Sequence, residues 1–201
     1  MTKKLLTTVF ILFAACQVFA ATLEVVKHPA KDVQGTGPLP YNYRIIDGHI
    51  HAGGHPLNPI TEFSNSDEQV MSILNYLKSK DVYTVIDLEN TGRIQKRYQG
   101  LLDKAGIKRI HIPLNSIKVP NKEEWGRIKA AMERPVYIHC KWGADRTGMV
   151  IARYLIEEDG YTPDQAYRAV VGGGTHAGAL GGFKKYLANI LLKKFIFSGP
   201  N

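Results

Sequence analysis

One short segment of the sequence combines a nucleophile with an anion-binding side chain. It runs from Val136 to Gly148 and reads VYIHCKWGADRTG, with seven residues from Cys140 to Arg146. The apolar start predicts a buried strand, and the change of pattern after Cys140 predicts a tight loop and then a helix. A helix N-terminus offers unpaired N–H groups and a partial positive charge to an anion. An arginine can add two parallel hydrogen bonds to a phosphate. The spacing therefore favours a loop that encloses one phosphate group.

The same positive surroundings predict a reactive Cys140. Beside a helix N-terminus and an arginine, a cysteine pKa falls from about 8.5 to roughly 3.5–7.5. The thiolate would attack phosphorus and form a phosphocysteine. We expect the Thr147 hydroxyl to hydrogen-bond the sulfur and His139 to order the loop. The phosphate-binding residues expected here are Lys141, Trp142, Gly143, Ala144, Asp145 and Arg146.

The pattern His-Cys-x-x-Gly-x-x-Arg-Thr-Gly at residues 139–148 resembles the signature loop of protein-tyrosine and dual-specificity phosphatases. The segment Gly53-Gly54-His55-Pro56 is similar to a glycine-rich turn of small bacterial members. Residues 84–88 resemble their second strand, and residues 111–116 resemble the segment that enters their acid loop. The resemblance covers about residues 43–195 and implies a phosphatase without a metal or cofactor. The catalytic residues it implies are Cys140, Arg146, Asp145 and Thr147.

The sequence departs from this family at the general acid. The family usually places an aspartate about thirty residues before the cysteine, where it protonates the leaving oxygen. This chain has Asn115 and Ser116 in that neighbourhood. Asp145, directly before the arginine as in myotubularin-like phosphoinositide phosphatases, is the leading replacement, although it could instead only brace the loop. Glu123 and Glu124 are weaker candidates, since acids are favoured in the first turn of a helix anyway.

Two loop residues indicate a substrate class. Lys141 after the nucleophile and Asp145 before the arginine are more typical of enzymes that act on inositol phosphates. The resemblance therefore points to tyrosine-phosphatase-like phytases, with an inositol polyphosphate as the small-molecule partner. The alternative is a dual-specificity or tyrosine phosphatase that acts on phosphoproteins. The formal charge of +8 suits an anionic substrate, whereas the chain has no basic block interleaved with aromatic residues that would predict nucleic-acid binding.

The first twenty residues predict export. Lys3 and Lys4 precede an apolar run from Leu5 to Cys16, which is too short to span a bilayer. Small residues then surround a cleavage site after Ala20, as in a secretory signal peptide. The mature protein would be periplasmic or secreted and would carry a charge of +6 after loss of the two lysines. An uncleaved anchor, or lipid attachment at Cys16, remains an alternative; no other membrane association is expected.

The rest of the chain predicts one α/β domain with a central, mostly parallel sheet flanked by helices. We divide the 201 residues into a signal peptide at 1–20, an extended leader at 21–42 and a phosphatase domain at 43–201. Strands are expected at 43–47, 82–88, 108–112 and 136–139. Helices are expected at 94–105, 147–158 and 183–194, and after the capping residues Ser66, Asn121 and Thr162.

Two other functions compete with this interpretation. Asp47, His49, His51 and His55 imitate the Asp-x-His-x-His start of metal-dependent amidohydrolases. That fold is a barrel of about 250 residues, which is longer than this domain. The second competitor is an inactive phosphate-binding module, which the missing upstream acid would support.

Overall fold

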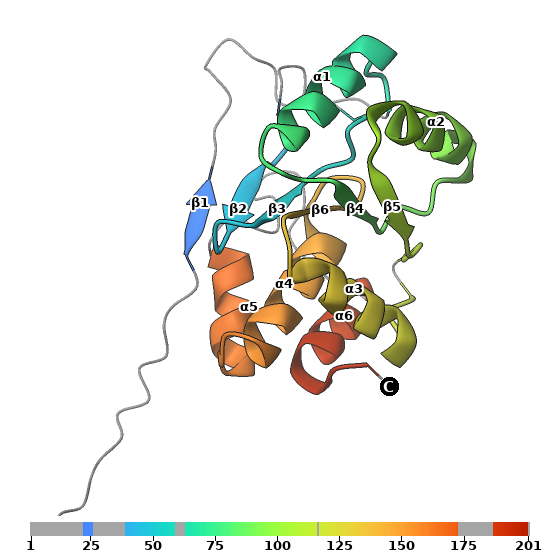
Figure 1. Cartoon of the computed structure of the whole chain (residues 1–201). Coiled ribbons are helices and arrows are strands. Elements are labelled where there is room, and N and C mark those ends of the chain that lie inside the picture. Colours follow the sequence, from blue (N-terminus) through green and yellow to red (C-terminus); the bar gives the residue numbers. More distant parts are fainter. Residues whose placement is uncertain (1–21, 26–38, 59–62, 116, 173–186, 201) are drawn as a thin grey trace, which may run out of the picture.

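The computed structural model describes residues 22–25, 39–58, 63–115, 117–172 and 187–200 (Figure 1). The predicted signal peptide, with Cys16, lies outside these ranges. Within them, every helix is too short or too polar to cross a bilayer.

A six-stranded sheet forms the centre of the fold, in the order β1-β2-β3-β6-β4-β5. Strand β2 pairs antiparallel with both of its neighbours, β1 and β3, whereas β3, β6, β4 and β5 are parallel. This confirms the predicted α/β class with a mostly parallel sheet. The strands are β1 (Leu23–Val25), β2 (Arg44–Ile46), β3 (Ile50–Gly53), β4 (Thr84–Asp87), β5 (Lys108–His111) and β6 (Val136–His139).

Helices cover both faces of the sheet. In Figure 1, α1 and α2 lie on one face, and α3, α4, α5 and α6 lie on the other. The helices are α1 (Asp67–Lys78), α2 (Gln95–Ala105), α3 (Lys122–Met132), α4 (Asp145–Glu157), α5 (Pro163–Gly172) and α6 (Leu187–Ser198), and a 3-10 turn η1 (Gly92–Ile94) precedes α2.

Local capping signals fix two of the helix starts as predicted. Ser66 and Gln69 form a capping box at α1, and Asn121 and Glu124 form another at α3. Each box satisfies two backbone N–H groups that the helix itself leaves unpaired. Gly106 ends α2 with a φ of 69°, a conformation that glycine adopts without a steric penalty.

Other boundaries differ from the predicted ones. Strand β3 was not predicted, because its sequence, Ile-His-Ala-Gly, has no strand signature and only pairing with β2 and β6 defines it. Helix α4 begins two residues earlier than expected, and α6 continues to Ser198 instead of ending at Lys194. Part of the leader, at 23–25, pairs with β2 as an edge strand.

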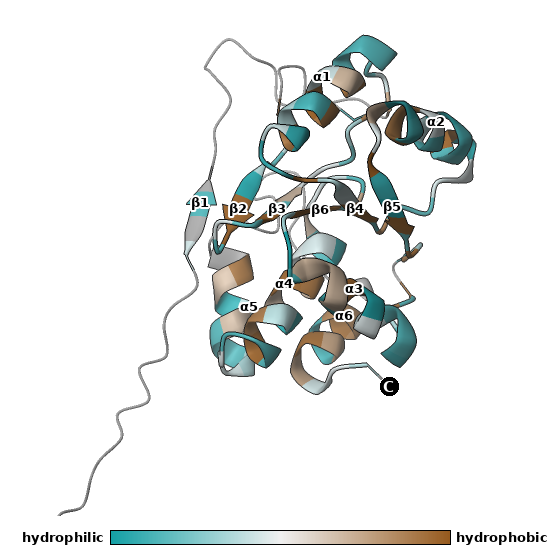
Figure 2. Cartoon of the chain, in the orientation of Figure 1, coloured by the Kyte–Doolittle hydropathy of each residue, from teal (hydrophilic) through white to brown (hydrophobic). Residues whose placement is uncertain are grey.

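Two apolar cores lie on either side of the sheet. One packs α3, α4, α5 and α6 against it, and the other packs α1 and α2. Figure 2 shows apolar segments on the central strands and on helix surfaces next to them, with polar segments further out. All four residues of β6 are buried. The central strand therefore gives a rigid base to the loop that follows it.

Candidate functional site

The segment Cys140–Arg146, which we call the phosphate loop, starts at the carboxyl end of the central strand. In the sheet register, His139 at the end of β6 lies beside Gly53 on β3 and Asp87 on β4. Open α/β sheets bind ligands at this edge. Helix α4 begins at Asp145, so the loop has a strand end on one side and a helix N-terminus on the other, as the sequence predicted.

Cys140 and Arg146 both lie largely inside the protein. Cys140 is 3% exposed and is a free cysteine. Nη1 of Arg146 donates to the backbone oxygens of Leu88 at 3.0 Å and Leu114 at 2.9 Å, and Nη2 donates to Oε2 of Glu89 at 2.9 Å. Burial alone would lower the Arg146 pKa, but the charges of Cys140 and Glu89 outweigh it and raise this pKa. The guanidinium is therefore charged and held in one orientation.

Glu89 is the residue that holds Arg146, and the sequence interpretation missed it. Its side chain is 2% exposed, and its Oε1 accepts hydrogen bonds from the Thr91 backbone N–H and hydroxyl. One carboxylate thus ties the loop after β4 to the start of α4. The sequence signal that could have identified Glu89 is its position just after β4, which ends beside β6. Functional residues of parallel sheets gather at such strand ends.

The glycine-rich turn at residues 53–56 packs directly against the phosphate loop. Gly143 has a φ of +66°, and a Cβ built on it would lie 2.2 Å from the Gly53 carbonyl carbon. The N–H of His55 donates to the Lys141 carbonyl at 3.1 Å. Only a residue without a side chain permits this approach, so Gly143 sets the path of the loop.

Two asparagine side chains anchor the loop carbonyls from outside. Nδ2 of Asn58 donates to the Lys141 oxygen at 2.9 Å, and Nδ2 of Asn42 donates to the Gly143 oxygen at 3.1 Å. Because these two carbonyl oxygens accept hydrogen bonds from neighbouring segments, they point away from an anion that the loop would enclose.

His139 lies beneath the loop in a buried polar network. Its Nε2 pairs with the Tyr98 hydroxyl at 3.0 Å, and its Nδ1 lies 3.6 Å from Oδ1 of Asp87. Arg109 binds Oδ2 of Asp87, with its Nε at 3.0 Å. Burial lowers the pKa of His139, although Asp87 opposes the shift. A buried, hydrogen-bonded neutral ring suits the predicted ordering of the loop rather than proton transfer.

His55, Asp87 and His139 bring nitrogen and oxygen atoms within 4.8 Å of one another, which is the kind of cluster that can hold a metal. The Leu57 N–H donates to Nδ1 of His55 at 3.1 Å, and burial lowers the His55 pKa well below its usual value. The neutral ring therefore carries its proton on Nε2 and has no lone pair there for a metal. Arg109 also occupies Oδ2 of Asp87. This donor set does not fit a metal ion.

The amidohydrolase-like histidines are not brought together. His49 bonds to the carbonyls of Asp47 and Met132, and His51 bonds to the Tyr43 hydroxyl. Among the described residues, neither belongs to a cluster that could ligate a metal. The geometry therefore gives no support to the metal-dependent alternative.

Thr147 differs from its predicted role. It is completely buried, and within the described part of the chain its hydroxyl has no hydrogen-bond partner. The expected bond to the Cys140 sulfur is absent from this structure. Because α4 begins at Asp145, Thr147 lies inside the first turn instead of at its edge. Asp145 itself is half-buried in that turn, next to Arg146.

The remaining candidates for the general acid lie at the family's acid position and in the first turn of α3. At the family's acid position, Oδ1 of Asn115 accepts the Ile117 N–H at 2.8 Å. Glu124 pairs with Lys118 at 2.7 Å. Burial alone would raise the Glu124 pKa. Hydrogen bonds from Lys118 and Asn121 outweigh burial, so the pKa lies below its usual value. Glu124 therefore lacks the raised pKa of a proton donor. Glu123 is exposed in the first turn of α3.

A second buried arginine, Arg44, interacts electrostatically with Cys140. Burial lowers the pKa of Arg44 to about 10, and the negative charge of Cys140 opposes this shift. Its Nη1 donates to the Asn42 carbonyl at 2.9 Å, and Asn42 in turn anchors Gly143. The sequence interpretation did not name Arg44. The signal that could have identified it is a charged residue among the otherwise apolar residues 43–46 of a predicted strand.

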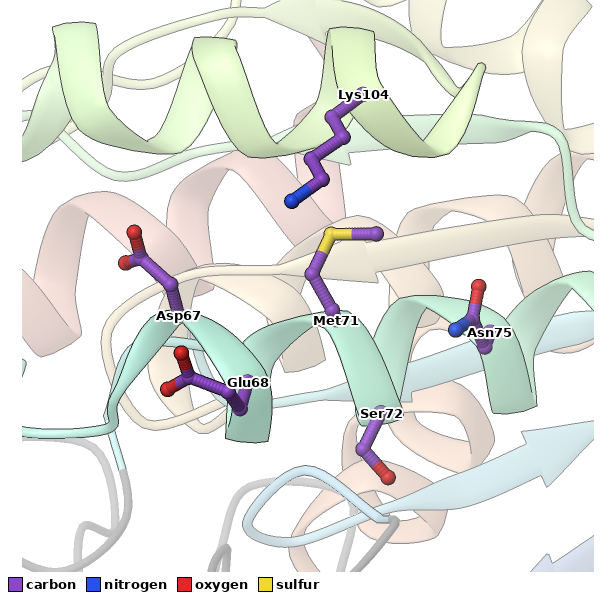
Figure 3. A pocket seen from close by; sticks show the side chains of 6 residues that line it. All are labelled: Asp67, Glu68, Met71, Ser72, Asn75 and Lys104. Atoms are coloured by element: carbon purple, nitrogen blue, oxygen red, sulfur yellow. The ribbon is translucent and has the colours of Figure 1, made fainter.

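A surface pocket lies elsewhere, between α1 and α2. Figure 3 shows Lys104 of α2 extending toward Asp67, Glu68 and Met71 of α1. None of the residues that line it belongs to the phosphate loop. We assign it no part in the chemistry.

A strand, a seven-residue loop from cysteine to arginine and a helix N-terminus, on a mostly parallel sheet, form the arrangement expected for a cysteine-dependent phosphatase. Residues 63–160 match a family described as "Polymorphic toxin system, DSP-PTPase phosphatase". This match covers just under half of the chain and, with the relatives below, supports the resemblance to cysteine-dependent protein-tyrosine and dual-specificity phosphatases.

Individual relatives are distant. The "Phosphatidylglycerophosphatase and protein-tyrosine phosphatase 1" of Mus musculus is 26% identical over 135 residues, covering 64% of this chain and 65% of the relative. A "Tyrosine-protein phosphatase" of Autographa californica nuclear polyhedrosis virus is 29% identical over 133 residues, covering 61% and 77%. The chain thus spans slightly less than two thirds of the length of the mammalian relatives.

Solved structures share the fold. P. aeruginosa TpbA aligns with a TM-score of 0.56 and 20% identity, over 76% of this chain and 83% of that one. The core catalytic domain of the PP-IP phosphatase SIW14 from S. cerevisiae aligns with a TM-score of 0.53 and 17% identity, over 79% and 85%. At such identities the likeness establishes the architecture.

Proposed function

We propose that the protein hydrolyses phosphomonoesters through a cysteinyl-phosphate intermediate and that its substrates are inositol polyphosphates such as inositol hexakisphosphate. The observation that carries this proposal is the placement of Cys140 and Arg146 at the two ends of one loop, with Arg146 fixed by Glu89 and two backbone carbonyls.

The chemistry follows from the loop. A substrate phosphate sits between the loop and the N-terminus of α4, and Arg146 donates to two of its oxygens. The Cys140 thiolate attacks phosphorus, and the bond from phosphorus to the ester oxygen breaks. That oxygen takes a proton, and water then cleaves the sulfur–phosphorus bond to release phosphate.

Asp145 is the proton donor in this proposal. It lies next to Arg146, whereas Asn115 is an amide and Glu89 and Glu124 are ion-paired. Because a general acid matters most for a poor leaving group, Asp145→Asn should lower kcat more for an alkyl phosphate than for p-nitrophenyl phosphate. Equal losses on both substrates would show that Asp145 only braces the loop.

Charge supports the substrate class. Lys141 is half-buried in the loop and lies next to the nucleophile, and the chain has a net charge of +8. One structural neighbour is titled a PP-IP phosphatase, and another was solved with PI(5)P. Two relatives are named protein-tyrosine phosphatases, which favours phosphotyrosine as the second candidate substrate.

The decisive experiment measures phosphate release by the full chain from inositol hexakisphosphate and from a phosphotyrosine peptide. Cys140→Ser is the control, since it keeps the loop but replaces the nucleophile. Release from the inositol phosphate alone, lost in Cys140→Ser, supports the proposal. Release from the peptide alone would make it a protein phosphatase, and binding without release from either substrate would leave a phosphate-binding module.

Export is part of the proposal, because residues 1–20 have the pattern of a signal peptide. Fractionation of expressing cells should place a shortened protein in the periplasm or medium. Full-length protein in the cytosol would contradict this, and label from a radioactive fatty acid would indicate lipid attachment at Cys16.

A further inference from the structure

The ring of Phe63 lies against the phosphate loop without belonging to it. Phe63 is 7% exposed, and its N–H donates to Oδ1 of Asn58 at 3.1 Å. Nδ2 of the same asparagine donates to the Lys141 carbonyl at 2.9 Å. Asn58 therefore links the Phe63 backbone to the backbone of Lys141, the residue that follows Cys140.

Two cationic groups from separate segments approach this one ring. Nζ of Lys141 lies 5.8 Å from the Phe63 ring centroid, and Cζ of Arg93 lies 5.8 Å from the same centroid. Both distances are typical of cation–π contacts. Lys141 also lies 5.7 Å from the Trp142 centroid. Two positive charges therefore lie close to one aromatic ring, and one of them belongs to the residue that follows Cys140.

Arg93 is coupled to the catalytic arginine through a short rigid connection. It lies in η1, whose N-cap is Thr91. Thr91 donates two hydrogen bonds to Glu89, and the other oxygen of that carboxylate accepts from Arg146. The phosphate loop is therefore joined to Phe63 near Cys140 and to η1 at Arg146.

We propose that Arg93, Lys141 and Phe63 form a second anion subsite, which binds a further phosphate group of the substrate while the first occupies the phosphate loop. This deepens the proposed function by naming residues that select polyphosphorylated substrates. A guanidinium over a ring face presents its N–H edge to an anion, and arginine matches phosphate with two parallel hydrogen bonds. A substrate with a single phosphate has no group for this subsite.

The test compares Arg93→Ala with wild type on inositol hexakisphosphate and on p-nitrophenyl phosphate, at low ionic strength because exposed charges are screened by salt. The matched control is Arg127→Ala, because Arg127 is also exposed and lies on α3, which covers the face of the sheet opposite α1 and α2. We expect Arg93→Ala to lower the ratio of kcat/KM values, hexakisphosphate over p-nitrophenyl phosphate, by about tenfold or more. Arg127→Ala should keep the wild-type ratio.

An unchanged ratio in Arg93→Ala would overturn the subsite, as would an equal fall in the Arg127 control. Wild type that cleaves only p-nitrophenyl phosphate would refute the proposed substrate class, and the subsite would then be judged by inhibition. In that case a tenfold weaker inhibition of Arg93→Ala by inositol hexakisphosphate supports the second anion subsite. Inhibition equal to that of wild type refutes it.

Discussion

Gly143 offers the sharpest test of how the phosphate loop is held. Its φ of +66° is disfavoured for any residue with a side chain, and an added Cβ would lie 2.2 Å from both the carbon and the oxygen of the Gly53 carbonyl and 2.6 Å from the Gly54 nitrogen. All three neighbours are backbone atoms, so no side chain can rotate away. Gly143→Ala must therefore displace either the loop or the turn at residues 53–56.

The geometry sets the expected size of the effect. Ordinary contact begins near 3.4 Å, so the two segments must separate by about 1 Å. The left-handed backbone costs roughly 1–2 kcal/mol, and overpacking costs typically 1–3 kcal/mol. We expect a loss of about 2–5 kcal/mol in the free energy of unfolding, or about 4–20 °C in Tm. A displacement of about 1 Å at a reacting centre can reduce turnover by about a hundredfold.

The assay combines thermal melting with kcat/KM on p-nitrophenyl phosphate. Gly100→Ala is the matched control, because Gly100 lies in the exposed part of α2, and its Cβ would meet nothing within 4 Å. Removing a helical glycine should stabilise the protein by about 0.5–1 kcal/mol and leave turnover unchanged. Wild-type Tm and turnover in Gly143→Ala would refute the proposed packing of the loop against the turn.

Two further predictions concern charges outside the loop. Arg109→Ala should lower the free energy of unfolding by about 3–5 kcal/mol in a denaturant titration, because it leaves the fully buried Asp87 without its ion-pair partner. The control is Arg97→Ala, whose ion pair is exposed and whose loss should cost less than about 1 kcal/mol in the same titration. Equal losses in the two variants would contradict the argument. Burial and the nearby Asp47 raise the Asp159 pKa to about 6, so the folded state binds this proton more tightly and loses stability as pH rises from about 4 to 6. Asp159→Asn should therefore be more stable than wild type at pH 7, by about 1 kcal/mol after solvent screening. The difference should be smaller at pH 4. The same difference in Tm at both pH values would show that titration of Asp159 does not affect stability.

Much of the fold was predictable because its signals are local. The capping boxes at Ser66 and Asn121 and the stop at Gly106 depend on hydrogen bonds and backbone angles within a few residues. The buried strand before Cys140 was recognisable from its apolar run. Strand β3 was not, because its definition comes from partners on β2 and β6 that are distant in the chain.

The sequence by itself determined the spacing of Cys140 and Arg146 and the loop between them, since this spacing is a property of one continuous segment. Their roles as nucleophile and phosphate-binding arginine stay predictions. Only the tertiary structure decided what supports this loop. Glu89 reaches Arg146 from the loop after β4, Gly143 packs on the turn at residues 53–56, and Arg93 and Lys141 each approach the Phe63 ring. Each of these contacts joins segments that are separate in the chain and are brought together by the parallel sheet, so no local pattern could specify them.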